Sequence, residues 1–140
     1  MYTGETNIEV RYYETDLMGI VHHSNYIRYF ECGRVQALTD VGLPMTEIEA
    51  RGIMMPVVAV NLNYKTPARF GDMLRVVTII RELPKASITI ETQIYNQRGE
   101  EVCNGNVRLG FIHSDSRKVT RCPQYFIEAF SPYFELNKEI

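Results

Sequence analysis

Apolar and polar residues alternate with a period of two along four segments in the middle of the chain. These segments cover residues 58–65, 74–81, 87–94 and 103–111. A period of two places every second side chain on one face of a β-strand. The pattern therefore predicts four long strands, each with one apolar face. Short connections separate them, and we expect strands joined in this way to be antiparallel neighbours.

A helical pattern precedes these strands. Between residues 26 and 41, apolar side chains recur every three or four positions, which predicts one long helix with an apolar face. Ser24 or Asn25 suits its N-cap, because either side chain can accept a hydrogen bond from a free backbone N–H. Gly42, followed by Pro44, predicts where the helix ends.

Gly33 stands inside this helix, where it costs about 1 kcal/mol of helix propensity relative to Ala. Close packing of the helix backbone on a sheet would explain why a glycine is there. Shorter elements complete the pattern: a strand at 8–12, a helix at 44–51, an edge strand at 117–120 and a terminal helix at 123–130.

One long helix and several strands, each with an apolar face, pack most simply when the sheet curls around the helix. The sequence thus predicts an α+β fold in a single domain that spans residues 1–140. An open sheet leaves an edge that needs cover, and edge-to-edge pairing of two sheets in a dimer is one solution.

Composition narrows the class of function. The chain has 140 residues, of which 45% are hydrophobic and 23% charged, as in ordinary globular proteins. The net charge of -2 has the wrong sign for binding nucleic acid through bulk charge. No segment approaches the roughly 20 apolar residues of a membrane span, so we expect no membrane insertion.

The start of the chain is also unlike a signal peptide, because it has neither a basic region nor an apolar core. The cysteines are Cys32, Cys103 and Cys122, an odd number at distant positions. A disulfide framework is therefore not expected, and we predict a cytoplasmic protein.

Reactive groups concentrate in the loop at residues 12–26, between the first strand and the long helix. Asp16 is either a turn residue or a general base or nucleophile. Its apolar neighbours favour the second interpretation, because partial desolvation makes a carboxylate more reactive. Free backbone N–H groups at the helix start, near residues 23–26, can stabilise an oxyanion.

His22 and His23 are adjacent, which makes a poor metal site because only one of two neighbours usually points inward. No third ligand has a recognisable spacing, so no metal is expected. One of the two can bond a carboxylate or thioester oxygen, and either can equally be a surface residue. Cys32 has no obvious activating base and is interpreted as a packing residue.

Several nucleotide and hydrolase signatures are absent from the sequence. It contains no G-x-S-x-G elbow, no phosphate-binding P-loop and no G-x-G-x-x-G. A serine-type hydrolase and a dinucleotide-dependent enzyme therefore lack support.

The loop and the first turns of the helix carry the pattern Thr15-Asp16-x-x-Gly19-x-Val21-x-His23-x-x-Tyr26, followed by Phe30-Glu31 and Arg34. This pattern resembles the hot-dog-fold acyl-CoA thioesterases of the 4-hydroxybenzoyl-CoA thioesterase and YbgC type. The strand pattern between residues 53 and 112 agrees with that fold. The resemblance implies an antiparallel sheet wrapped around one long central helix.

The same resemblance implies hydrolysis of an acyl-CoA to a carboxylic acid and coenzyme A, without a metal or organic cofactor. Asp16 matches the catalytic carboxylate, which attacks the thioester carbonyl or activates water, and His23 matches a residue close to the thioester. Gly19 and Tyr26 would contact substrate. A backbone N–H at the helix start or within residues 52–56 would polarise the carbonyl.

For the acyl group, the resemblance implies a pocket lined by Met54 and Met55, whose flexible side chains suit apolar groups. Leu17 and Met18 are bulkier than the residues that often follow the aspartate, and His22 stands where an aromatic residue is common. The resemblance also implies a homodimer with the active site at its interface, and dimers in this family often form a homotetramer. Surface cations that could meet the coenzyme A phosphates are Lys65, Arg69 and Lys85, for which plain surface charge is the simpler interpretation.

Two other functions fit the same fold. A non-catalytic module could use the pocket to bind acyl-CoA and regulate a partner. A hot-dog hydratase or dehydratase would use an acid on the central helix, where Glu31 is the only acid well inside. A pairing of Glu31 with Arg34 explains that residue more simply.

Overall fold

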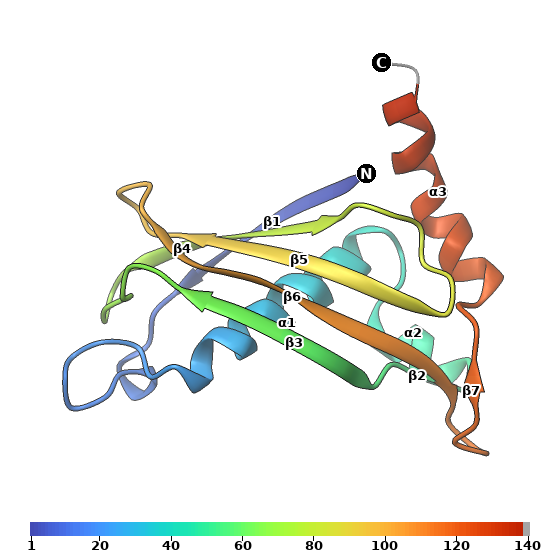
Figure 1. The fold of residues 1–140 in the computed structure, drawn as a ribbon, viewed down its shortest axis with the longest axis horizontal. Coiled ribbons are helices and arrows are strands. Elements are labelled where there is room, and N and C mark those ends of the chain that lie inside the picture. Colours follow the sequence, from blue (N-terminus) through green and yellow to red (C-terminus); the bar gives the residue numbers. More distant parts are fainter. Residues whose placement is uncertain (139–140) are drawn as a thin grey trace.

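The computed structural model describes residues 1–138, in which one long helix lies against one antiparallel sheet (Figure 1). The strands are β1 (Tyr2–Glu9), β2 (Ile53–Met54), β3 (Val57–Tyr64), β4 (Met73–Ile80), β5 (Ser87–Tyr95), β6 (Glu101–His113) and β7 (Val119–Thr120). The helices are α1 (Ser24–Asp40), α2 (Met45–Ala50) and α3 (Gln124–Lys138), and a 3-10 turn, η1 (Tyr12–Glu14), follows β1.

Within residues 1–138, seven strands form the sheet in the order β1-β4-β5-β6-β2, and β3 and β7 also pair with β6. Every pairing is antiparallel. The predicted α+β arrangement of an antiparallel sheet around one long helix is therefore confirmed. The four strands and the helix that the periodicity predicts all form, with ends shifted by a few residues at most.

One predicted pairing is wrong. We expected β3 and β4 to be neighbours, but β3 pairs with β6 and β4 pairs with β1 and β5. Residues 65–72 instead form a crossover that carries the chain from one side of the sheet to the other. This crossover passes the start of α1, where Ala68 bonds to Tyr26. The connection is longer than the three-residue turn that the sequence indicated.

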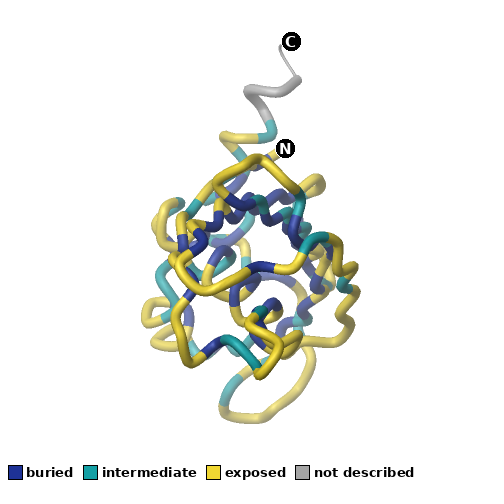
Figure 2. The backbone as a smooth tube through the Cα atoms, turned by 90° about the vertical axis from the view of Figure 1, so that its left-hand side faces the viewer, coloured by how far each residue is buried: buried dark blue, intermediate teal, exposed yellow. Residues whose placement is uncertain are grey.

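The helix α1 packs closely on β4, as the glycine within it predicted. A Cβ atom on Gly33 would lie 2.7 Å from Thr78 Oγ1 and 2.9 Å from Val76 Cγ1. Only a glycine leaves room for the helix backbone at this distance. Figure 2 shows that the buried backbone gathers at the centre of the molecule, with exposed segments around it. The large buried side chains of α1 are Tyr26, Tyr29, Phe30 and Leu38.

The two ends of the chain differ from expectation. The first strand covers Tyr2–Glu9 rather than residues 8–12, and Tyr12 lies exposed in η1. The terminal helix α3 extends well past residue 130 because its aromatic face packs on β1. The Tyr2 ring makes edge contacts with Phe130 and Tyr133, at centroid distances of 5.5 and 5.1 Å.

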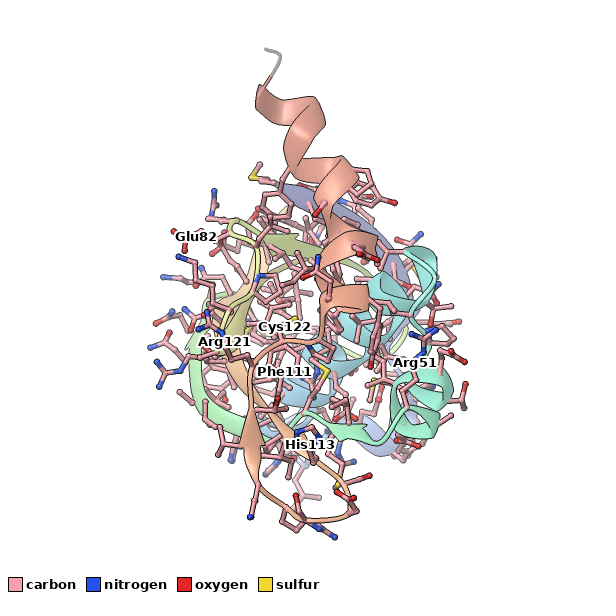
Figure 3. The ribbon with its side chains drawn as sticks, turned by 90° about the vertical axis from the view of Figure 1, so that its right-hand side faces the viewer. Arg51, Glu82, Phe111, His113, Arg121 and Cys122 are labelled. Atoms are coloured by element: carbon pink, nitrogen blue, oxygen red, sulfur yellow. The ribbon has the colours of Figure 1, made fainter. Side chains whose placement is uncertain are left out.

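The sheet has an exposed apolar edge at β3. Val57, Val58 and Val60 are 47%, 53% and 42% exposed. At the end of the molecule under α3, Phe111 and Cys122 are buried (Figure 3), and the Phe111 ring contacts Phe126. No helix among residues 1–138 is long and apolar enough to cross a membrane.

Candidate active site

The Asp16 loop is a tight turn held by its own backbone. The Gly19 N–H donates to the Asp16 carbonyl at 3.0 Å, and the Asp16 N–H donates to the Ile20 carbonyl at 2.8 Å. Gly19 has a φ of 77°, a left-handed conformation that favours glycine. Predicted as a substrate contact, Gly19 is observed as the residue that closes this turn.

The carboxylate of Asp16 is oriented by the same turn. Its Oδ1 atom accepts the Met18 N–H at 2.8 Å, and the side chain is partly exposed. The second carboxylate oxygen accepts no hydrogen bond from any residue that the structure describes. One oxygen is thus anchored and the other is available for chemistry.

The start of α1 lies beside this turn. Ser24 is the first helical residue, and the ring Nδ1 of His22 accepts its N–H at 3.2 Å. The predicted N-cap residues, Ser24 and Asn25, lie inside α1; His23 occupies the N-cap position, and its side chain makes no capping hydrogen bond. The His22 and His23 rings stack at a centroid distance of 4.1 Å.

The backbone N–H of His23 differs from those around it. The N–H groups of Asn25 and Tyr26 donate to the carbonyls of His22 and His23, at 2.9 and 3.4 Å. Within residues 1–138, the His23 N–H has no acceptor. A free donor at the positive end of the α1 dipole is suited to an oxyanion or a polarised carbonyl.

Asp16, His23 and Tyr26, three of the predicted site residues, line one cavity of about 260 Å³. The other lining residues are Met18, Ile20, Val21, Tyr64, Lys65, Thr66, Pro67 and Val102. The Tyr26 hydroxyl accepts the Ala68 N–H at 3.1 Å. Burial raises the pKa of Tyr26 above its ordinary value, which is already well above neutral.

The two predicted methionines lie elsewhere. Met54 pairs with Ile112 near one end of β6, whereas Tyr64, which lines the cavity, pairs with Cys103 near the other. An extended chain rises about 3.3 Å per residue, so positions 55 and 64 are about 30 Å apart. The strand β2 and the start of α1 lie toward opposite ends of the molecule (Figure 1). Within one chain, Met54 and Met55 therefore do not reach Asp16.

The candidate phosphate-binding cations separate in the same way. Lys65 lines the cavity, and Arg69 forms an isolated β-bridge with Ile20 at its wall. Lys85 lies instead in a larger hollow on the outer face of the sheet. Cys32 is exposed on α1, so its interpretation as a packing residue is wrong.

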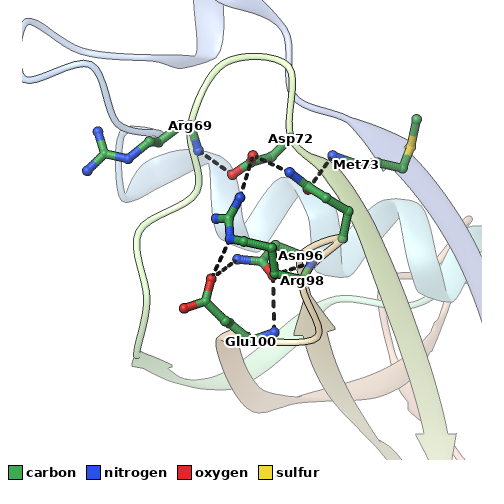
Figure 4. Close-up of polar contacts among 7 residues, drawn as sticks. Arg69, Asp72, Met73, Asn96, Arg98 and Glu100 are labelled. Atoms are coloured by element: carbon green, nitrogen blue, oxygen red, sulfur yellow. Dashed lines mark hydrogen bonds and ion pairs between the residues drawn. The ribbon is translucent and has the colours of Figure 1, made fainter.

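A polar network around the buried carboxylate of Asp72 holds the crossover against which the loop rests (Figure 4). The Asp72 carboxylate accepts the Arg69 N–H at 2.9 Å and the Gln97 amide at 3.0 Å. The Arg98 guanidinium lies 3.9 Å from Asp72. The network fixes the crossover, whose Ala68 carbonyl accepts the Val21 N–H at 2.8 Å.

Sequence reasoning missed one buried residue beside the site. Glu14 is only 5% exposed, although it lies in a loop two positions before Asp16. Its Oε1 atom accepts the Arg11 N–H at 2.8 Å and the Tyr29 hydroxyl at 3.0 Å. The signal that could have found it is the pair Asn25 and Tyr29, two polar side chains one turn apart on the buried face of α1.

The fold, a sheet wrapped around one long helix, is that of hot-dog thioesterases. Residues 10–130 match the thioesterase-like superfamily, and the chain belongs to that family. The resemblance that the Asp16 loop suggested is therefore confirmed.

Curated relatives agree with this assignment. The chain is 39% identical over 100 residues to the putative acyl-CoA thioesterase YneP of Bacillus subtilis. The aligned region covers 71% of this chain and 72% of YneP. It is 28% identical over 123 residues to the acyl-CoA thioester hydrolase YbgC of Escherichia coli O6:H1, covering 88% and 92%.

Among solved structures, DHNA-CoA thioesterase from Staphylococcus aureus superimposes with a TM-score of 0.91 at 33% identity. The match covers 99% of this chain and 95% of that one. The hot-dog fold is thus shared over nearly the whole length.

Proposed function

We propose that the protein hydrolyses acyl-CoA thioesters, with the Asp16 carboxylate and the His23 N–H acting on the same carbonyl group. The observation that carries this proposal is their placement on one cavity: an anchored carboxylate with a free oxygen, beside a helix N-terminus with a free donor. Thiol release from acyl-CoA substrates by the purified protein tests it.

The chemistry follows from these two groups. The His23 N–H would hydrogen-bond the thioester oxygen and stabilise the negative charge that grows on it when the carbonyl carbon is attacked. Asp16 either attacks that carbon, forming an anhydride that water then cleaves, or removes a proton from an attacking water. In both routes the carbon–sulfur bond breaks and coenzyme A leaves. The proposed reaction needs no metal or organic cofactor.

A homodimer completes the proposed site. The exposed valines of β3 provide an edge that a second copy can extend by antiparallel pairing. A two-fold axis between β3 and the β3 strand of the other copy would set the residue 57 end of one strand beside the residue 64 end of the other. Met54 and Met55 of the partner subunit would then approach Asp16, which the methionines of the same chain do not reach. Association of two dimers into a tetramer stays a prediction.

Support for the substrate class comes from the relatives and from charge. The names of YneP and YbgC both specify acyl-CoA, and the S. aureus structure is a DHNA-CoA thioesterase, so an aromatic acyl-CoA belongs in the substrate panel with aliphatic ones. Lys65 at the cavity and Arg69 at its wall are the cations best placed for the coenzyme A phosphates.

The hydratase alternative is less well supported. The Glu31 side chain is 62% exposed on α1 and does not line the cavity. Its carboxylate lies 4.0 Å from the Arg34 guanidinium, the pairing that the helical spacing indicated.

A cytoplasmic location also stays a prediction. The free thiols of Cys32, Cys103 and Cys122 are consistent with it.

A further inference from the structure

Glu14 is a buried carboxylate that the proposed reaction does not use. It sits at the end of η1 with three donors around its side chain. Oε1 accepts the Arg11 N–H at 2.8 Å and the Tyr29 hydroxyl at 3.0 Å, and Oε2 lies 3.5 Å from the Arg11 guanidinium. A buried charge is tolerated only when it is paired in this way.

The main chain of the same residue makes a second set of contacts. The Glu14 carbonyl accepts the His22 N–H at 2.9 Å and the Asn25 side-chain amide at 2.9 Å. The side chain therefore binds the second turn of α1 through Tyr29, and the main chain binds Asn25 in the first turn and His22 just before the helix. Both ends of the Asp16 turn are held to α1 by one residue.

We propose that Glu14 is a positioning residue that sets the distance between the Asp16 carboxylate and the His23 N–H. Asp16 follows Glu14 by two residues, and His23 directly follows His22, which Glu14 binds. The inference rests on the proposed function, because it assigns Glu14 to those two groups. A misplacement of about 1 Å between reacting groups can cost on the order of 100-fold in rate.

Tyr29 is the partner through which the carboxylate acts. Burial and the adjacent Glu14 raise the pKa of Tyr29, so the phenol stays protonated and remains a donor. Its ring packs edge-on against Tyr26 at 5.9 Å, so the contact continues into the cavity wall. Removing the hydroxyl alone should loosen the turn while the ring continues to fill the core.

The test compares Glu14→Gln and Tyr29→Phe with the wild-type protein, and uses Glu9→Gln, an exposed glutamate of β1, as the matched control. We expect both variants to lower kcat by roughly 10- to 100-fold while KM changes less than about two-fold. Glu9→Gln should leave kcat and KM unchanged. Circular dichroism and the melting temperature report whether each variant is folded under assay conditions.

A double-variant cycle separates positioning from general stability. If Glu14 acts through Asp16, then Glu14→Gln has little further effect on the residual rate of Asp16→Asn. An equal fold-loss in both backgrounds, or unchanged kcat in folded Glu14→Gln, would overturn the assignment of Glu14 alone. Absence of thiol release by the wild-type protein would instead refute the proposed function, and this assignment with it.

Discussion

The hydroxyl of Tyr26, in the first turn of α1, accepts a hydrogen bond from the backbone N–H of Ala68 at 3.1 Å. This bond joins the helix to the crossover that passes from β3 to β4, and both residues are buried. The wall of the cavity at Tyr26 is therefore fixed by a contact between segments 42 residues apart.

Tyr26→Phe should destabilise the protein, because it leaves the buried Ala68 N–H without an acceptor. The expected loss is about 1–3 kcal/mol in the free energy of unfolding. Tyr64→Phe is the matched control, since the Tyr64 hydroxyl is exposed and its bond to the His23 carbonyl is long, at 3.5 Å. Urea unfolding of both variants measures the difference, and equal stability of the two would contradict the role of the Tyr26 bond.

Gly33→Ala tests the close packing of α1 on β4. Alanine gains about 1 kcal/mol of helix propensity, but its Cβ would press on Thr78 and Val76. Overpacking of this kind costs about 1–3 kcal/mol. We therefore expect the free energy of unfolding to fall by up to about 2 kcal/mol, which a lower melting temperature would show. A variant more stable than the wild-type protein would show instead that the helix can move away from the sheet.

Val60→Lys tests the proposed dimer. A charged side chain at an exposed edge discourages strand pairing, so light scattering should show a larger monomer fraction than for the wild-type protein. Thiol release should fall in parallel, because the partner subunit's methionines are withdrawn. Val119→Lys changes an exposed valine in β7 and should leave both unchanged. A variant at Val60 that stays dimeric would place the interface elsewhere.

The three thiols should react at very different rates. Cys32 is exposed, whereas burial raises the pKa of Cys103 to about 11 and of Cys122 to about 12. Brief iodoacetamide treatment at pH 8 should therefore modify Cys32 alone, as read by mass spectrometry. Rapid labelling of Cys103 or Cys122 in the folded protein would contradict their burial.

The same shifts set the sign of a pH effect on stability. Unfolded thiols ionise near pH 8.5, while the folded ones hold their protons to about pH 11 and 12. Above about pH 8.5 the unfolded state therefore binds fewer protons, and the stability that the neutral thiols contribute falls as pH rises toward the folded values. Stability that rises over this interval would contradict the sign.

The periodicity of the sequence predicted the elements in which buried and exposed side chains alternate regularly. The long strands and α1 each place one face against the same core, so their pattern is visible locally. The pairing of β3 with β6 was missed because it depends on the path of residues 65–72, which only tertiary contacts decide. The length of α3 was missed for a similar reason, since Tyr2 lies at the other end of the sequence.

The candidate site was predicted where its residues are neighbours in sequence. Asp16, His23 and Tyr26 come from one loop and the helix that follows, and they line one cavity. Glu14 was missed because a glutamate beside a turn resembles a solvated residue, and its burial depends on Tyr29. The roles of Met54 and Met55 depend on a second copy of the chain and stay predictions.

The most direct measurement is thiol release from a panel of aliphatic and aromatic acyl-CoAs by Asp16→Asn, beside the wild-type protein. Asparagine keeps an oxygen that can accept the Met18 N–H, so the turn is preserved while the negative charge is lost. Asp115→Asn, at an exposed turn, serves as the control. We predict that Asp16→Asn stays folded and loses roughly 100- to 10,000-fold in kcat. Turnover within a few-fold of wild type would contradict the account.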